Sequence, residues 1–110
     1  MAPREIVDER VLRAIDYLRR NLHRRVTLNE VAAAVFLSPS RFRHLFVEET
    51  GMALRPYLLW LRFMRAWEAI AAGESLTAAA HHAGFADSAH LTRTSRRMFG
   101  LAPTAMQLGD

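Results

Sequence analysis

The feature that most constrains this chain of 110 residues is an internal repeat. Thr27 and Ser75 lie 48 positions apart and Ser38 and Asp87 lie 49 apart, so the second copy is one residue longer near its middle. Equivalent positions keep helix caps, apolar residues and terminal glycines in one order: Leu28 and Leu76, Val31-Ala32 and Ala79-Ala80, Phe42 and Leu91, Gly51 and Gly100. Because chance would not preserve all three kinds of position together, the repeat predicts a duplicated helix-turn-helix.

Helical spacing extends over the whole chain. Apolar residues at positions 11, 15, 18 and 22 mark one face of a first helix that opens near Asp8. Two more helices begin at the capping box Thr27-x-x-Glu30 and at Ser38, and a longer one runs from about residue 56 to 72. No stretch alternates as a half-buried strand does. We therefore predict an all-α fold of about seven helices, with helix-turn-helix subdomains at 8–51 and 75–107 joined by a linker helix at 55–73.

The composition indicates a small basic domain. Apolar residues make up 51% of the chain, which is enough for a core but too interrupted by charge for a membrane span. The N-terminus lacks a signal peptide's apolar run and there is no cysteine, so we expect a cytoplasmic location. The net charge is +4 and all 15 basic residues are arginine, which suits phosphate and guanine. A GC-rich genome also produces arginine in place of lysine, so the choice of arginine is not evidence of a ligand. The positive net charge alone points to a polyanionic partner.

The ordered motifs resemble the AraC/XylS family of bacterial transcription regulators, from Val11 to about Met106. The first copy carries Leu28-x-x-Val31-Ala32 and Ser38-x-x-x-Phe42-x-x-x-Phe46. The segment between the copies carries Tyr57-Leu58-x-x-x-Arg62-Phe63-x-x-Ala66. The second copy carries Gly84-Phe85-x-Asp87, followed by Arg93, Phe99, Gly100 and Ala102-Pro103. Two departures are Phe36, where the family often has glycine in the first turn, and Ser95, where an aromatic residue is usual.

The resemblance implies a function in transcription. It implies sequence-specific binding of double-stranded DNA on the bacterial nucleoid, and activation through contact with RNA polymerase. Without a sensor domain, the chain is similar to the short regulators of the multiple-antibiotic-resistance and superoxide-response type. We expect a monomer on DNA if the chain is complete, and a DNA-binding fragment of a longer regulator is the alternative.

The first candidate recognition helix runs from residue 39 to 49. Ser40, Arg43 and His44 fall on the face opposite the apolar residues Phe42, Leu45 and Phe46. Arg43 is expected to contact a guanine, with Ser40 and His44 on neighbouring bases and Arg41 on phosphate. An ordinary solvated helix face is the alternative, and the duplication favours the recognition helix.

The second candidate recognition helix runs from residue 88 to 99. Its outward residues are Ser88, Ala89, Thr92, Arg93, Arg96 and Arg97, whereas Leu91, Met98 and Phe99 are expected to be buried. Arg93 matches an arginine shared by the family and is expected to contact a base or a phosphate, with a surface salt bridge as the alternative. Thr94 and Ser95 replace the apolar pair of the first copy, which predicts a more weakly anchored helix.

The linker helix carries two apolar stripes, which predicts contact with a subdomain on each side. The stripes are Leu59, Phe63, Ala66 and Ile70, and then Trp60, Met64 and Trp67. We interpret both tryptophans as core residues, and an exposed Trp60 that binds a partner is the alternative. A helix of about 17 residues could hold two recognition helices about one DNA turn apart, roughly 34 Å.

The histidines do not indicate a metal or catalytic site. His81 and His82 are adjacent, so on a helix they point about 100° apart. No catalytic or phosphate-binding motif accompanies them. We therefore expect no enzyme activity, no cofactor, no metal and no membrane partner. The rival function is a helical protein-interaction module, or adaptor, with a basic face, which steep salt-dependent binding to one DNA sequence would exclude.

Overall fold

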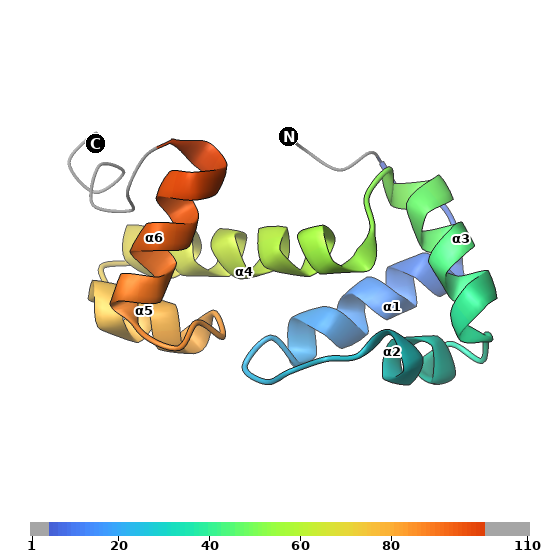
Figure 1. The fold of residues 1–110 in the computed structure, drawn as a ribbon. Coiled ribbons are helices and arrows are strands. Elements are labelled where there is room, and N and C mark those ends of the chain that lie inside the picture. The colour runs from blue at the N-terminus through green and yellow to red at the C-terminus, as the bar shows by residue number, and fades with distance from the viewer. Residues whose placement is uncertain (1–4, 101–110) are drawn as a thin grey trace. The chain divides into compact units, whose positions relative to one another are not determined.

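A computed structural model describes residues 5–100. This part of the chain contains six helices and no strand (Figure 1). Their bounds are α1 Glu9–Arg20, α2 Leu28–Ala34, α3 Pro39–Thr50, α4 Leu54–Ala71, α5 Leu76–His82 and α6 Ser88–Phe99. The predicted all-α fold is confirmed, with six helices in the described residues against about seven expected. Residues 101–107 of the predicted second subdomain lie outside the described residues.

The caps predicted from the sequence start these helices. Side chains of Asp8, Ser38 and Ser75 accept hydrogen bonds from the first turns of α1, α3 and α5. Thr27 and Glu30 form both bonds of the capping box on α2, with N–O distances of 3.2 and 3.0 Å. The Asp87 carboxylate accepts from the His90 N–H at 2.7 Å. The C-caps of α3 and α6, Gly51 and Gly100, share the left-handed conformation with φ of 76°.

Helix α4 begins earlier than predicted. It starts at Leu54 rather than near Pro56 and spans 18 residues. Proline is tolerated there because the first-turn N–H groups of a helix have no acceptor within the helix, so Pro56 removes no hydrogen bond. The chain divides into two compact units between Trp60 and Leu61, so each unit receives part of this helix.

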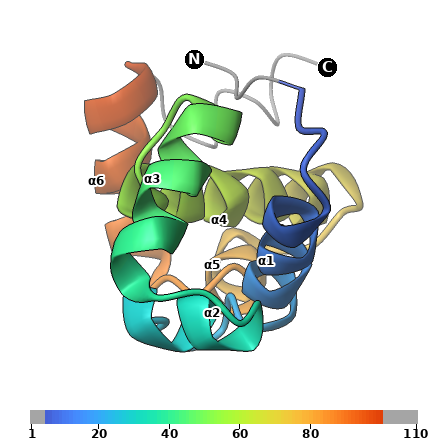
Figure 2. The ribbon, with the colours of Figure 1, turned by 90° about the vertical axis from the view of Figure 1, so that its right-hand side faces the viewer.

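The first unit is built around α1. Val11, Leu18 and Leu22 are at most 1% exposed, and Ile15 is also buried, as the spacing predicted. Figure 2 shows α1, α2 and α3 of this unit from the α3 side. The Phe46 ring lies 5.4 Å from Phe42 and 5.1 Å from Tyr57, so the beginning of α4 completes the aromatic core. Two expectations need correction. Leu28 was expected to be buried with Val31 and Ala32, and Leu45 with Phe42 and Phe46, but both leucines are only half-buried. Leu28 is the first residue of α2, and Leu45 lies on α3 beside Phe42 and Phe46, which already occupy the inner face of that helix.

The second unit uses aromatic residues of α4 as its core. Phe63 is fully buried, with ring centroids 5.3 Å from Phe85 and 5.0 Å from Phe99. Ala66 and Ile70 are buried as predicted, whereas Leu59, in the first unit, is half-buried. Met98 and Phe99 were expected to be buried but are half-buried, because they occupy the last turn of α6.

Both tryptophans are half-buried and pack against other rings. Trp67 lies 5.0 Å from Phe99 and 5.9 Å from Phe63, and Trp60 lies 5.9 Å from Tyr57. They contribute to the aromatic clusters without being fully enclosed.

Candidate nucleic-acid interface

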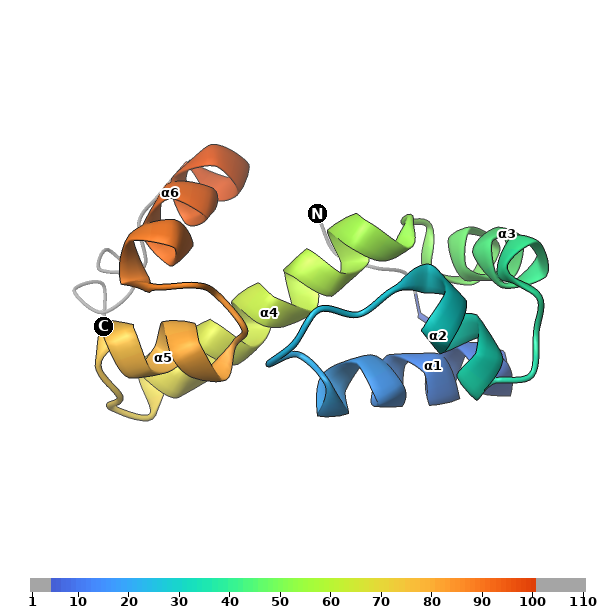
Figure 3. The ribbon, with the colours of Figure 1, turned by 60° about the horizontal axis from the view of Figure 1, so that its bottom comes forward.

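The two helix pairs share one turn geometry. The Leu37 N–H donates to the Ala32 carbonyl at 3.0 Å, and its counterpart Phe85 donates to Ala80 at 2.9 Å. The residue before each donor has a positive φ, 60° at Phe36 and 86° at Gly84. Figure 3 shows both pairs, α2 with α3 and α5 with α6. The duplication therefore extends to the backbone, and Phe36 adopts a conformation that favours glycine.

The predicted residues of α3 reach solvent together. Ser40, Arg41, Arg43 and His44 are all exposed, whereas Phe42 and Phe46 on the opposite side are at most 1% exposed. The His44 Nδ1 lies 2.9 Å from the Ser40 carbonyl, which can only accept, so Nδ1 carries a hydrogen. Because His44 is exposed, Nε2 is then the ring nitrogen available to a ligand.

Two hollows flank α3. Ser40, Arg41 and His44 line a shallow one of about 260 Å³ with Arg10, Leu37, Leu45 and Glu48. Arg43 instead lines a second hollow of about 410 Å³ with residues before α2, at its start and around the start of α4. The strip predicted as a single row is therefore divided, with Arg43 on one side and the Ser40–His44 pair on the other.

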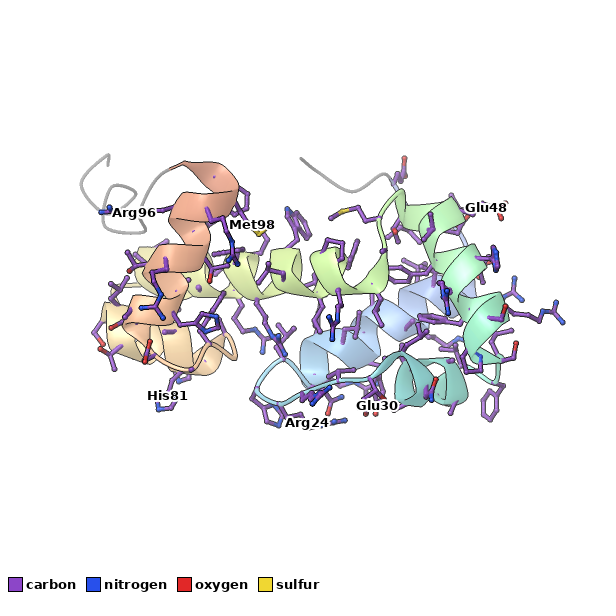
Figure 4. The ribbon with its side chains drawn as sticks, in the orientation of Figure 1. Arg24, Glu30, Glu48, His81, Arg96 and Met98 are labelled. Carbon is purple, nitrogen blue, oxygen red and sulfur yellow. The ribbon has the colours of Figure 1, made fainter. Side chains whose placement is uncertain are left out.

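The predicted residues of α6 form a second exposed set. Ala89, Arg93, Arg96 and Arg97 are exposed, and Ser88 and Thr92 are half-buried. Figure 4 shows Arg96 and Met98 leaving α6 on opposite sides. Thr94 and Ser95 are buried, as their repeat positions predicted, and the Thr94 hydroxyl donates to the His90 carbonyl at 2.7 Å. That bond satisfies a polar group that the second unit encloses.

The arginines of α3 and α6 are not neutralised by neighbouring carboxylates. Within residues 5–100, Arg41, Arg43, Arg93, Arg96 and Arg97 form no ion pair. The arginine–carboxylate pairs of the described residues lie on α1 and its N-cap, and between the loop after α1 and the first turn of α2: Asp8 with Arg10, Glu9 with Arg13, Asp16 with Arg20, and Glu30 with Arg24. The guanidinium groups on α3 and α6 are therefore available to an anionic ligand.

A charged network fixes the end of α1 to the start of α2. Arg24 donates to the Glu30 carboxylate at 2.7 Å (both residues are labelled in Figure 4). The Tyr17 hydroxyl also donates to this carboxylate, at 2.7 Å. Arg24 first, then Tyr17 and the Thr27 N–H, lower the pKa of Glu30 to about 2. The capping glutamate of α2 is thus also the anchor that holds α2 against α1.

The histidines form no metal cluster in the part of the chain that the structure describes. His81 and His82 are exposed, and the His82 Nδ1 lies 2.8 Å from the Glu74 carboxylate. None of the described helices is long and apolar enough to cross a membrane.

Sequence reasoning missed Arg25 and Arg55, which join Arg43 in the larger hollow. Arg25 stands two residues before the Thr27 cap, and Arg55 is in the first turn of α4. No periodicity connects positions this far apart, so only the fold brings them together.

Curated relatives of the chain are bacterial regulators. It is 28% identical over 93 residues to the probable transcriptional regulator LumQ of Photobacterium leiognathi, covering 84% of this chain and 38% of LumQ. It is 37% identical over 84 residues to the regulatory protein Ada of Salmonella typhimurium, covering 76% of this chain and 24% of Ada. The chain thus spans less than half the length of these relatives.

Solved structures share the fold. The DNA-binding domain of AdpA, solved with a target DNA, has a TM-score of 0.79 at 22% identity, and the match covers 93% of each chain. An AraC-type regulator from Chromobacterium violaceum has a TM-score of 0.80 at 22% identity, and the match covers 90% of this chain and 89% of that one. Residues 31–108 also match the family described as a helix-turn-helix domain. The chain belongs to this helix-turn-helix domain family and has the fold of AraC-type DNA-binding domains.

Proposed function

We propose that the chain reads one asymmetric site on double-stranded DNA with α3 and α6, as a monomer, and activates transcription. The observation that supports this most strongly is the set of exposed arginines on both helices with no ion pair in the described residues. Such side chains pay no cost of breaking internal pairs when they bind phosphates or base edges.

The proposed contacts of α3 follow from the chemistry of each side chain. Arg43 donates two hydrogen bonds to a guanine, and Ser40 and the His44 Nε2 contact neighbouring bases. Arg41 pairs with a phosphate and fixes the register of the helix in the major groove.

The proposed contacts of α6 differ in kind. Arg93 contacts a base or a phosphate, and Arg96 and Arg97 pair with phosphates. The Ala89 methyl group is suited to a thymine methyl, whereas the hydroxyls of Ser88 and Thr92 suit either bases or backbone. Because the two helices present different residues, the two half-sites should differ in sequence.

The second proposed partner, besides DNA, is RNA polymerase, which the chain contacts to activate transcription. Family membership supports this step, and a curated relative from Escherichia coli is called a transcriptional activator. A regulator of this kind works on the chromosome, so we propose the bacterial cytoplasm, at the nucleoid, as its location. No enzymatic step, cofactor or metal is part of the proposal.

The test is a selection of bound sequences from random duplex DNA, followed by titrations at several salt concentrations. We expect one enriched sequence with two unlike halves, and affinity that falls steeply with salt. No enrichment over scrambled DNA would contradict the proposal and favour the protein-interaction module instead.

A further inference from the structure

The larger hollow beside α3 combines several aliphatic side chains with arginines and has no acidic residue in its lining, whereas Glu48 lines the smaller hollow. Its volume is about 410 Å³, and its lining residues are Arg25, Val26, Thr27, Leu28, Arg43, Ala53, Leu54, Arg55 and Leu58. We call it the α3–α4 groove. All nine residues belong to the first unit, so its shape depends on that unit alone.

The charge of the α3–α4 groove has one sign. Three of its nine lining residues are arginines and none is acidic. Arg25, Arg43 and Arg55 are exposed and form no ion pair within residues 5–100. A ligand that complements this lining needs a negative group, because guanidinium pairs strongly with carboxylate.

The apolar part of the groove defines the remainder of that ligand. Val26, Leu28 and Leu54 are half-buried and Leu58 is 7% exposed, and no aromatic ring lines the groove. A volume of this size is within the range of small-molecule pockets. A DNA phosphate would satisfy the arginines, but the deoxyriboses attached to it are not a continuous aliphatic chain that could extend along Val26, Leu28 and Leu58.

We propose that the α3–α4 groove binds a linear aliphatic carboxylate, with its headgroup among Arg25, Arg43 and Arg55 and its chain along Val26, Leu28 and Leu58. Arg43 is also the residue assigned above to base contact. The bound carboxylate therefore competes with DNA for Arg43, a consequence that rests on the proposed function. Coupling between two ligands is reciprocal, so operator DNA weakens the carboxylate by the same factor.

Direct binding is tested with decanoate as the probe and decanol as its uncharged counterpart. Titration into the isotope-labelled chain should shift the methyl resonances of Val26, Leu28 and Leu58 saturably. Decanol should bind at least about tenfold more weakly, because it lacks the charge that pairs with arginine. No saturable shift, equal affinity for decanol, or shifts confined to other methyl groups would overturn the proposal.

A matched pair of variants assigns the site. Arg55→Gln should weaken decanoate about tenfold, and Arg19→Gln, an exposed arginine on α1 outside the groove, should leave it unchanged. Equal effects of the two variants would overturn the assignment. A third outcome is that the native chain does not bind decanoate and that Arg55→Gln lowers the affinity for every DNA sequence. That outcome would show that the groove binds the DNA backbone instead.

The competition is measured on the selected DNA site. Decanoate at ten times its own Kd should raise the apparent Kd for DNA about tenfold. Unchanged DNA affinity with a saturated groove would overturn the competition. If no DNA sequence is selected, the proposed function is contradicted. The decanoate titration still shows in that case whether the groove binds a carboxylate.

Discussion

At the residue scale, Arg43, Phe36 and Glu30 each have a structural feature that makes a single substitution informative. Arg43 belongs both to the exposed face of α3 and to the α3–α4 groove. Phe36 is 90% exposed and has a φ of 60°. Glu30 caps α2 and also accepts from Arg24 and Tyr17. Each feature gives a single-residue prediction.

Arg43→Ala should cost about 1–3 kcal/mol of binding free energy on the selected site and relax preference at one base pair. The reason is the loss of a two-bond contact with a guanine edge. Arg41→Ala is the control, and it should weaken all sequences alike and reduce the salt slope by about one unit. Fluorescence anisotropy on the selected site and on single-base variants measures both. An equal loss on all sequences for Arg43→Ala would assign it to phosphate.

Phe36→Gly should raise the free energy of unfolding by about 0.5–1 kcal/mol. Relief of the left-handed strain, about 1–2 kcal/mol, exceeds the extra backbone entropy that glycine brings to the unfolded chain. Phe36→Ala is the control, because it keeps the strain and removes a side chain that is 90% exposed. Urea denaturation gives the comparison, and a glycine variant less stable than the alanine variant would contradict this account.

Glu30→Gln should destabilise the protein at pH 6 and progressively less as the pH falls from 4.5 toward 2. Arg24 and its neighbours hold the pKa of Glu30 at about 2, below its ordinary 4.5. A depressed pKa contributes stability above pH 4.5, and that contribution is lost as the pH falls toward 2. Urea denaturation of both proteins across this range is the measurement. A difference in stability that stays constant from pH 6 to 3 would show that the charge of Glu30 does not contribute.

At the element scale, α3 and α6 are copies with the same caps but different anchors. Phe42 and Phe46 hold α3, whereas Leu91, Thr94 and Ser95 occupy the inner face of α6. The aromatic residues of the second unit come from α4, from the turn before α6 and from the last turn of α6: the Phe63 ring of α4 lies 5.3 Å from Phe85 and 5.0 Å from Phe99. Packing lost within the repeat is thus partly replaced from outside it.

Amide hydrogen exchange should be faster in residues 76–99 than in 28–49 in the free protein. The hydroxyl-bearing inner face of α6 buries less apolar surface than the paired phenylalanines of α3, so its local opening costs less. The gap should narrow on the selected DNA, which stabilises the bound form of α6. Exchange resolved by NMR or mass spectrometry tests this, and equal protection of both helix pairs without DNA would refute it.

Helix starts could be predicted from the sequence because each cap is a hydrogen bond between neighbours. Thr27 and Glu30, or Asp87 and His90, are three residues apart, so the sequence contains the whole interaction. The degree of burial could not be predicted in the same way. Leu45 was expected to be buried with Phe42 and Phe46, but its helical spacing does not say whether a neighbour covers it.

At the scale of the whole molecule, the repeat could be predicted, whereas the α3–α4 groove could not. The groove combines residues 25–28, 43, 53–55 and 58, whose proximity depends on how α2, α3 and α4 fold together. The exposed residues of α3 and α6 were found because one polar helix face is a local pattern. The proposed function of the whole chain requires that α3 and α6 bind the same DNA molecule at the same time.

The central claim is that one copy of the chain binds one asymmetric DNA site with both α3 and α6. The measurement that tests this claim most directly is hydroxyl-radical footprinting on the selected DNA, combined with the mass of the complex. We predict one copy of the chain per DNA and two protected patches about one DNA turn apart, roughly 34 Å. Arg43→Ala should weaken one patch and Arg93→Ala the other. A symmetric palindrome occupied by two copies, or a single patch unaffected by either variant, would contradict this claim.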